Sequence, residues 1–220
     1  MNSSLKTQGR LLHAASEIFA EKGFRESTVA EICELAKANI AAVNYHFGDK
    51  MNLYREVWGF LFEEEATRQP LPENFDEIGA EAWLRLFIST RIENIMDSGF
   101  GGRLPRLLHR EMGEPTELHE EIFITHLKPN HERVKTAIKE FIGPACTEDQ
   151  LKLAVHNFMG LHIFLNVGHQ KSRNFPNAEG PKCRLPQFDE PAELIRQIET
   201  FAIGGLRATR DLIQSSDVPL

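Results

Sequence analysis

Long apolar runs, paired cysteines and known catalytic signatures are missing from this chain of 220 residues. No apolar stretch approaches the roughly 20 residues that a bilayer-spanning helix needs. The opening residues, MNSSLKTQGR, lack the apolar core of a secretory signal. The three cysteines, Cys33, Cys146 and Cys183, lie in dissimilar contexts, which favours reduced thiols over a disulfide framework. We therefore expect a cytoplasmic protein that does not enter a membrane.

Signatures of catalysis and of metal binding are also missing. There is no P-loop and no nucleophile elbow, and the GFGG of residues 99–102 follows a helical pattern where a dinucleotide site needs a strand. The nine histidines form no H-E-x-x-H motif, and the pair His119 and His126, like the pair His162 and His169, is separated by two helical turns. We therefore expect no catalytic residue, no metal and no cofactor, and hence a protein that is not an enzyme.

No segment reads as a strand, and apolar residues recur at helical spacing along most of the chain. Breaks are expected after Gly23, over residues 69–74 (QPLPEN), at or near Pro129, and over residues 172–189. The predicted fold class is therefore all-α.

The most informative segment is residues 28–50, TVAEICELAKANIAAVNYHFGDK. Thr28 and Glu31 have the spacing of a capping box, in which each side chain satisfies an N–H that the first helical turn leaves unpaired. After Thr28, apolar residues recur at the spacing of a short helix with one buried face. The apolar positions are Val29, Ile32, Cys33 and Ala36.

A second short helix follows a tight turn at Lys37. Asn39 is suited to cap it, and Ile40, Val43 and Phe47 are expected to point inward. Small and hydrogen-bonding side chains are then left on the outer face, which is what close approach to base edges and phosphates requires. The outward positions are Ala41, Ala42, Asn44, Tyr45 and His46. The two helices have the layout of a helix-turn-helix motif.

Net charge argues superficially against DNA binding, because the formal value is −7. The charge is unevenly distributed, however. Residues 1–60 contain seven basic and seven acidic side chains, so the excess of negative charge lies in the remaining 160 residues. We call residues 1–60 the head and the remaining residues the body. A neutral head on an acidic body should contact few phosphates. We therefore expect DNA affinity to depend only modestly on salt, since each neutralised phosphate adds about −0.9 to the slope of log affinity against log salt concentration.

Nine residues are predicted to contact DNA, and several of them have a simpler alternative role. Tyr45 and His46 are either phosphate or base contacts or surface aromatics that pack on the following helix. Lys50 is either a phosphate ligand or a solvated lysine, and Asn44 has the groups to pair with adenine N6 and N7. The predicted set is Thr28, Lys37, Asn39, Ala41, Ala42, Asn44, Tyr45, His46 and Lys50.

The body carries two long apolar helices near its end, around residues 147–165 and 190–213. Their apolar surface exceeds what a monomer needs, and Gly204 and Gly205 within the second indicate a close helix approach. We expect these two helices to form a homodimer, because a helix-turn-helix protein reads symmetric half-sites as a dimer. The alternative is that they complete a monomeric core.

The body is also rich in aromatic residues, which either line an apolar ligand pocket or fill a core. Arg91, Arg110 and Glu111 are its candidate polar anchors, although Arg110 and Glu111 are equally suited to an ion pair that locks two helices. The candidate effector residues are Trp83, Phe87, Arg91, Arg110, Glu111, Phe123, Phe158, Met159 and His162.

The pattern AxxIFAEKGFRxSTVAxIxxxAxxNIAAVNYHFGDKxxLY resembles the DNA-binding head of the TetR family of transcriptional regulators over residues 8–58. Two positions depart from the family pattern: Lys37 replaces the usual turn glycine, and Asn44 stands where tyrosine is frequent. The form NIAAxxYxFGxK and the later stretch RLLHREMGEPT resemble the subgroup with a CerR-type C-terminal domain.

The resemblance implies a helix-turn-helix DNA-binding domain at residues 1–50 and a helical effector-binding and dimerisation domain at residues 51–220. It also implies a homodimeric repressor that binds a palindromic DNA operator and is released by a small-molecule effector. Two alternatives stay open. One is an all-helical ligand-binding protein or enzyme with a head that does not bind DNA, and the other is an adaptor whose head binds another protein.

Overall fold

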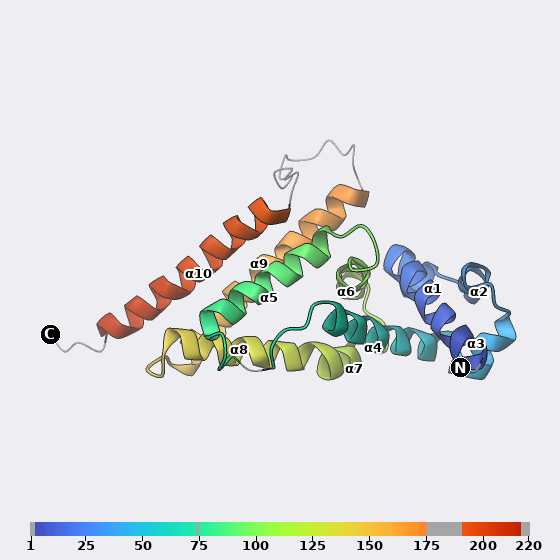
Figure 1. Ribbon diagram of the computed structural model, residues 1–220, viewed down its shortest axis with the longest axis horizontal. Coiled ribbons are helices and arrows are strands. Elements are labelled where there is room, and N and C mark those ends of the chain that lie inside the picture. The colour runs from blue at the N-terminus through green and yellow to red at the C-terminus, as the bar shows by residue number, and fades with distance from the viewer. Residues whose placement is uncertain (1–2, 74, 175–190, 217–220) are drawn as a thin grey trace. The chain divides into compact units, whose positions relative to one another are not determined.

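The computed structural model describes residues 3–73, 75–174 and 191–216, and within these ranges every regular element is helical (Figure 1). The predicted all-α fold is confirmed for this part of the chain. The loop predicted over residues 172–189 lies almost wholly outside the described residues, as does Cys183.

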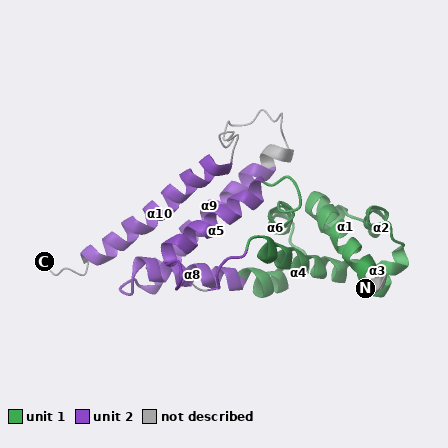
Figure 2. Ribbon diagram, in the orientation of Figure 1, with its two compact units in different colours: residues 1–69, 97–127 green, residues 70–96, 128–220 purple. Residues whose placement is uncertain are grey.

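The helices divide into two compact units, Met1–Gln69 with Asp97–Leu127 and Pro70–Met96 with Lys128–Leu220 (Figure 2). Unit 1 contains α1 (Ser3–Glu26), α2 (Val29–Ala36), α3 (Ile40–Phe47), α4 (Lys50–Arg68), α6 (Arg103–Gly113), α7 (His119–Ile122) and the π-helical turn η1 (Phe123–Leu127). Unit 2 contains α5 (Ala80–Met96), α8 (Lys128–Ile142), α9 (Glu148–Asn174) and α10 (Pro191–Ser216). This grouping follows packing, and the division into functional domains at residue 50 stays a prediction.

Unit 1 is built around α1, which packs against α2, α3, α4 and α6. The break predicted at Gly23 is present: its φ of 81° and ψ of 174° interrupt the helix before a last turn that ends at Glu26. The buried side chains of this core come from all four of the first helices and from α6 and α7. They include Leu11, Phe19, Ile32, Val43, Tyr54, Trp58, Leu104, Leu107 and Ile122.

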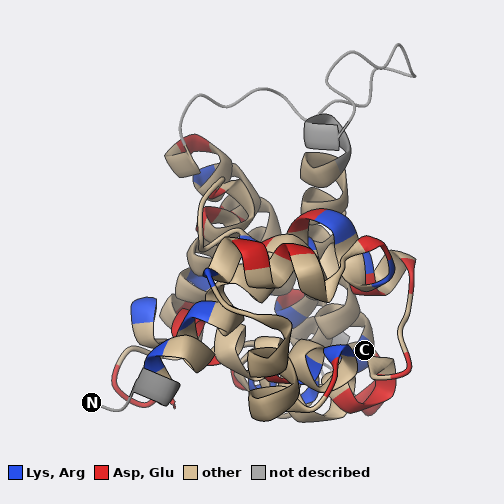
Figure 3. Cartoon of the chain, turned by 90° about the vertical axis from the view of Figure 1, so that its right-hand side faces the viewer, with Lys and Arg blue, Asp and Glu red and all other residues tan. Residues whose placement is uncertain are grey.

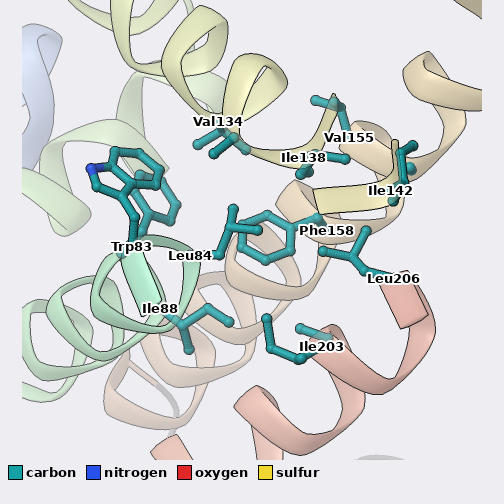
Figure 4. Close-up of a cluster of buried hydrophobic side chains, with 14 of the residues drawn as sticks. Trp83, Leu84, Ile88, Val134, Ile138, Ile142, Val155, Phe158, Ile203 and Leu206 are labelled. Carbon is teal, nitrogen blue, oxygen red and sulfur yellow. The ribbon is translucent and has the colours of Figure 1, made fainter. Parts of the chain in front are cut away.

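Unit 2 has its own core, in which α5, α8, α9 and α10 each contribute apolar side chains (Figure 4). Helix α5 packs on all three of the other helices, and it is therefore apolar around much of its circumference. The core residues include Trp83, Leu84, Ile88, Val134, Ile138, Ile142, Val155, Phe158, Ile203 and Leu206.

The helical interruption predicted near Pro129 is also present. The chain passes from α7 through the π-helical turn η1 into α8, whose second residue is Pro129. Proline has no N–H to donate, and the π-helical turn directly before it interrupts the regular α-helical hydrogen-bond pattern there.

Candidate nucleic-acid interface

Side-chain caps fix the start of α2 and α3, the two helices of the predicted helix-turn-helix. The backbone N–H and the hydroxyl of Thr28 both donate to Glu31 Oε2 at 3.0 Å, and Glu31 N–H donates to Thr28 Oγ1 at 3.2 Å. Asn39 Oδ1 accepts the N–H of Ala42 at 2.9 Å. Both caps are therefore as predicted, and they define the entry angle of each helix.

Lys22 ties the capping box to α1. Its ammonium donates to Glu31 Oε1, and this bond, followed by the bonds from Thr28, holds the pKa of the Glu31 carboxyl below its ordinary value. The carboxylate therefore stays ionised at neutral pH and links the end of α1 to the first turn of α2.

The outer face of α3 carries most of the side chains that were predicted to lie there. Val43 and Phe47 are buried, whereas Ala41 and Asn44 are exposed and Tyr45 is 80% exposed. Ala42 and His46 are half-buried at the edges of this face. His46 meets the ring of Tyr45 edge-on, with 4.9 Å between ring centroids, and also lies 6.0 Å from the ring of Phe47.

Ile40 is the exception on this helix, and the prediction that it points inward is wrong. Its side chain is 54% exposed. The spacing of Ile40, Val43 and Phe47 is helical, but Ile40 is the first residue of α3 and lies beyond the buried part of the face. An apolar side chain is thus exposed at the N-terminal end of α3.

The turn between α2 and α3 keeps a left-handed conformation although it has no glycine. Lys37 has φ 51° and ψ 49°, and it is the one non-glycine residue with positive φ among the described residues. Its N–H donates to Glu34 O at 3.1 Å, and the N–H of Ala38 donates to Cys33 O at 2.9 Å, so the end of α2 is satisfied. The side chain of Lys37 is exposed, and its Cβ strains the backbone in this left-handed conformation.

Replacing Lys37 by glycine should raise the free energy of unfolding by up to about 1 kcal/mol. Glycine removes the Cβ that crowds the following carbonyl, and the greater freedom of the unfolded chain offsets part of the gain. Urea unfolding at one fixed protein concentration measures the change. Lys37→Ala is the control, because it removes the amine and keeps the Cβ; equal stability of the glycine and alanine variants would contradict this account.

Lys50, the first residue of α4, is held by the protein itself. Its ammonium donates to Phe24 O and to Ser27 O, each at 2.5 Å, and lies 4.5 Å from the centroid of the Phe24 ring. Burial lowers the pKa of Lys50, against the opposing charges of Glu31 and Glu26. Its positive charge is therefore anchored beside the segment that leads into the capping box.

The charges of the head are balanced in sign, as the sequence indicated. Lys and Arg positions are interspersed with Asp and Glu positions along the helices (Figure 3). Lys6, Arg10 and Lys37 are exposed basic side chains of unit 1, and Arg10 also donates to Ala36 O at 3.1 Å.

Two arginines of α6 fasten it to α1. Arg103 donates to His13 O at 2.8 Å and to Ser16 Oγ at 2.9 Å, and it pairs with Glu17 at 2.5 Å. Arg110, which was a candidate effector anchor, donates to Glu21 O. The α6 helix is thus bound along much of the length of α1.

Glu111, another candidate anchor, lies in a buried network, with only 4% of the residue exposed. Tyr54 OH donates to Glu111 Oε2 at 2.8 Å, and Thr116 N–H donates to Oε1 at 2.9 Å. The Thr116 hydroxyl is 3.0 Å from Oε1, and His119 Nδ1 is 3.4 Å from it. Burial, and then the Glu111 charge, raises the pKa of Tyr54 well above its ordinary value, so the phenol stays a donor.

Six of the candidate effector residues meet in unit 2. The Trp83 and Phe87 rings stack at 5.7 Å, and Phe87 lies 6.2 Å from Phe158 and 5.6 Å from His162. The Arg91 guanidinium is 5.1 Å from the Phe87 ring centroid. Met159 packs, partly buried, against the same core. These residues form one aromatic cluster between α5 and α9.

His162 is the unusual member of this cluster, because it is a polar side chain in an apolar core. Both ring nitrogens are buried, and neither makes a hydrogen bond of good geometry. Burial, followed by the charge of Arg91, lowers the pKa of His162 to about 4, against a smaller opposite effect of the Phe158 and Met159 carbonyls. The imidazole is therefore neutral at pH 7.

The other three candidate effector residues, Arg110, Glu111 and Phe123, belong to unit 1. Arg110 and Glu111 are engaged in the contacts with α1, α4 and the turn before α7, and Phe123 is exposed. The alternative was an ion pair that locks two helices; the contacts seen are those of Arg110 with a backbone carbonyl of α1 and of Glu111 with the Tyr54 hydroxyl of α4, and each fastens α6 to another helix. The effector set is thus not gathered within one compact unit.

Sequence reasoning missed a hollow of about 300 Å³ on α9 and α10. Phe164, which is 67% exposed, lies on its wall, and Phe201 of α10 is 72% exposed. Exposed aromatic residues on helices are the signal that could have indicated it, but sequence alone does not tell which face of an apolar helix is left uncovered. The hollow is lined by His156, Asn157, Gly160, Leu161, Phe164, Leu165 and Ile198.

The described residues contain neither a membrane-spanning helix nor a metal-binding group of side chains. No described helix has the length and hydropathy needed to cross a membrane. In the same part of the chain, no three side chains from histidine, cysteine, aspartate and glutamate are grouped so that they could hold a metal ion.

Two family models match the chain. Residues 11–57 match the model described as "Bacterial regulatory proteins, tetR family". Residues 80–206 match the model described as "HTH-type transcriptional dual regulator CecR, C-terminal domain", which covers more than half of the chain. The two matches together span the α2–α3 motif, the helices around it and most of unit 2.

Curated relatives carry corresponding descriptions. The chain is 26% identical over 174 residues to the HTH-type transcriptional dual regulator CecR of Shigella flexneri, which is 73% of this chain and 76% of that protein. It is 30% identical over 99 residues to the HTH-type transcriptional repressor BepR of Brucella suis biovar 1 (strain 1330), which is 41% of this chain and 47% of that protein.

Solved structures share the fold. AibR, determined in complex with isovaleryl coenzyme A and operator DNA, matches with a TM-score of 0.65 and 14% identity, over 89% of this chain and 97% of AibR. HlyIIR, a hemolysin II transcriptional regulator, matches with a TM-score of 0.60 and 19% identity, over 90% of this chain and 98% of HlyIIR.

Proposed function

Because the chain belongs to the TetR family of bacterial regulatory proteins and has a C-terminal domain of the CecR type, we propose that it is a homodimeric repressor that binds a palindromic operator and is released by a small-molecule effector. The family consists of transcriptional regulators and not of enzymes. The proposal concerns the finer points, namely the dimer, the operator, the direction of regulation and the effector.

The main observation in support of DNA binding is the exposed outer face of α3. The caps of α2 and α3 fix where these two helices begin. In a helix-turn-helix the second helix enters the major groove, and its exposed side chains reach base edges. Asn44 can pair with adenine, and Tyr45 and His46 can reach phosphates. The proposed contacts are Thr28, Lys37, Asn39, Ala41, Ala42, Asn44, Tyr45, His46 and Lys50.

Lys50 takes a particular place among these contacts. Two carbonyls hold its ammonium beside Ser27, so it would reach a phosphate without losing side-chain freedom on binding. We place it at the phosphate nearest to the start of α2, together with Thr28. The operator and the cell's DNA make the cytoplasm the proposed location.

The proposed dimer rests on the exposed apolar residues of α9 and α10. Phe164, Phe201 and Leu212 lie on these helices together with the hollow that Phe164 lines. Apolar surface of this kind marks a protein interface. A second copy of the chain would cover it symmetrically and set two α3 helices toward successive major grooves, about 34 Å apart or a multiple of that.

The proposed effector site combines the aromatic cluster of α5 and α9 with polar groups. Arg91 and His162 of unit 2 are buried or half-buried among apolar rings, an environment in which polar ligand groups are recognised. The complex of AibR with isovaleryl coenzyme A and operator DNA supports a fold that binds both kinds of ligand. An effector releases DNA only to the extent that it binds the released conformation more tightly.

Selection of DNA from randomised oligonucleotides tests the proposed function, and enrichment of a palindromic site is the expected result. On that site, Asn44→Ala should weaken binding about 5- to 150-fold, because a bidentate contact to a base contributes about 1–3 kcal/mol. Fluorescence anisotropy at one stated salt concentration measures the affinity. Leu35→Ala, an exposed residue of α2, is the control and should bind as the parent does.

Failure to enrich any DNA would favour one of the other two classes of function. A protein-binding adaptor would bind a partner through α2 and α3, and a ligand-binding protein would bind its ligand with no DNA response. If Asn44→Ala bound the enriched site with unchanged affinity, α3 would not be the reading helix.

A further inference from the structure

The first residue of α3, Ile40, presents an exposed apolar side chain at the N-terminal end of this helix. Asn39, which precedes it, is the cap of α3, so Ile40 is the first side chain that the helix offers beyond its cap. In helix-turn-helix proteins the N-terminal residues of the recognition helix are those that contact base edges. Ile40 therefore stands where sequence is read, although nothing about its chemistry suits a phosphate.

The position of Ile40 on the helix leaves it with a defined set of neighbours. Ala41 and Asn44 share its side of α3, and both are exposed. Residues four apart on a helix lie one above the other, so Ile40 and Asn44 face adjacent parts of one surface. Ala41 beside them carries only a methyl group, which leaves room for the isoleucine side chain to approach another surface closely.

The major groove offers one apolar group to such a side chain. Thymine carries a C5-methyl group there, whereas adenine, guanine and cytosine present hydrogen-bond donors and acceptors. Isoleucine has no donor or acceptor in its side chain and gains only by removing apolar surface from water. Placed against any other base edge, it would desolvate polar atoms without replacing their hydrogen bonds.

We propose that Ile40 is a specificity-determining residue that packs against the C5-methyl group of a thymine in each half of the operator. The thymine lies beside the base that Asn44 contacts. This inference rests on the proposed function, since it requires that α3 enters the major groove. It adds a base preference that neither the caps nor the polar residues of α3 supply.

Removing single thymine methyl groups from the DNA tests the inference. In the site enriched by selection, each thymine is replaced in turn by deoxyuridine, which lacks only the methyl group and keeps the same pairing edge. At one position in each half-site, the parent protein should lose about fourfold in affinity, which corresponds to about 0.8 kcal/mol for one buried methyl-sized group. At that position Ile40→Ala should show no loss on the same replacement.

Two control variants separate a methyl contact from a general effect on α3. Ile40→Val keeps branched methyl groups and should retain most of the thymine preference. Leu35→Ala removes another exposed apolar residue of the head and should leave the parent's pattern unchanged. Ile40→Ala is expected to fold normally, because the residue is exposed and alanine favours the helix, and an unchanged thermal unfolding midpoint checks this.

The outcomes distinguish this inference from the proposed function. If no DNA is enriched, the proposed function fails. If a site is enriched but every deoxyuridine replacement costs the parent and Ile40→Ala the same, the protein reads DNA and the inference about Ile40 is overturned. A uniform loss of affinity in Ile40→Ala, equal for thymine and uracil sites, overturns it as well.

Discussion

Replacing both Phe164 and Phe201 by aspartate should convert the protein to monomers and lower its affinity for the operator by about 10²–10⁴-fold. Both rings are mostly exposed on α9 and α10, where the proposed partner subunit would cover them. In a dimer, binding of one half-site holds the second reader near the other half-site. A monomer loses that gain in effective concentration, although each α3 helix keeps its contacts.

Sedimentation equilibrium measures the mass of the variant, and fluorescence anisotropy measures its affinity for the full operator and for a single half-site. The double variant should bind the half-site as the parent does. Phe123→Asp is the matched control, because Phe123 is an exposed phenylalanine as well, at 48%, but lies on η1 in unit 1. A double variant that remained dimeric at micromolar concentration would show that α9 and α10 are not the interface.

The largest effect on stability is expected at Glu111. Glu111→Ala should lower the free energy of unfolding by about 3 kcal/mol, because it leaves the buried Tyr54 hydroxyl and the Thr116 N–H without their acceptor. Each donor stranded in this way costs about 1–3 kcal/mol. Urea unfolding at one fixed protein concentration measures the loss, since the stability of an oligomer depends on concentration.

A double-mutant cycle with Tyr54→Phe identifies the cause. In the parent, Tyr54→Phe removes one hydrogen bond and should cost about 1 kcal/mol. In the Glu111→Ala background it removes a hydroxyl that already lacks its acceptor, so it should cost nothing or restore stability. Equal costs of Tyr54→Phe in both backgrounds would show that the two side chains do not act together.

Local features of the fold were predictable because their partners lie close in sequence. The Thr28–Glu31 capping box and the Asn39 cap involve residues three apart, and the structure contains both. The resemblance to the TetR family is also confirmed, and the subgroup expected as CerR-type is the one described as CecR. The prediction that Ile40 is buried was wrong, because helical spacing identifies a face of the helix but not the residue at which the buried part of that face begins.

Contacts between distant segments were not predictable. Lys50 read as a phosphate ligand or a solvated lysine, but its carbonyl partners lie 23 and 26 residues away. Arg110 and Glu111 were expected either to anchor an effector or to form an ion pair that locks two helices, but their partners are a carbonyl of α1 and the Tyr54 hydroxyl of α4. Only the packing of α6 decides those partners, and spacing within α6 carries no information about it.

The attachment of α6 to α1 limits how the DNA-binding helices can be fused to the effector domain of another protein. Arg103 and Arg110 close over α1, and Leu104 and Leu107 belong to the same apolar cluster as Leu11 and Phe19. A chimera cut near residue 50 or 69 would strip away this cover and expose the side of α1 that it protects. A chimera that contains residues 97–127 as well as residues 1–69 would keep α6 and with it the cover of α1.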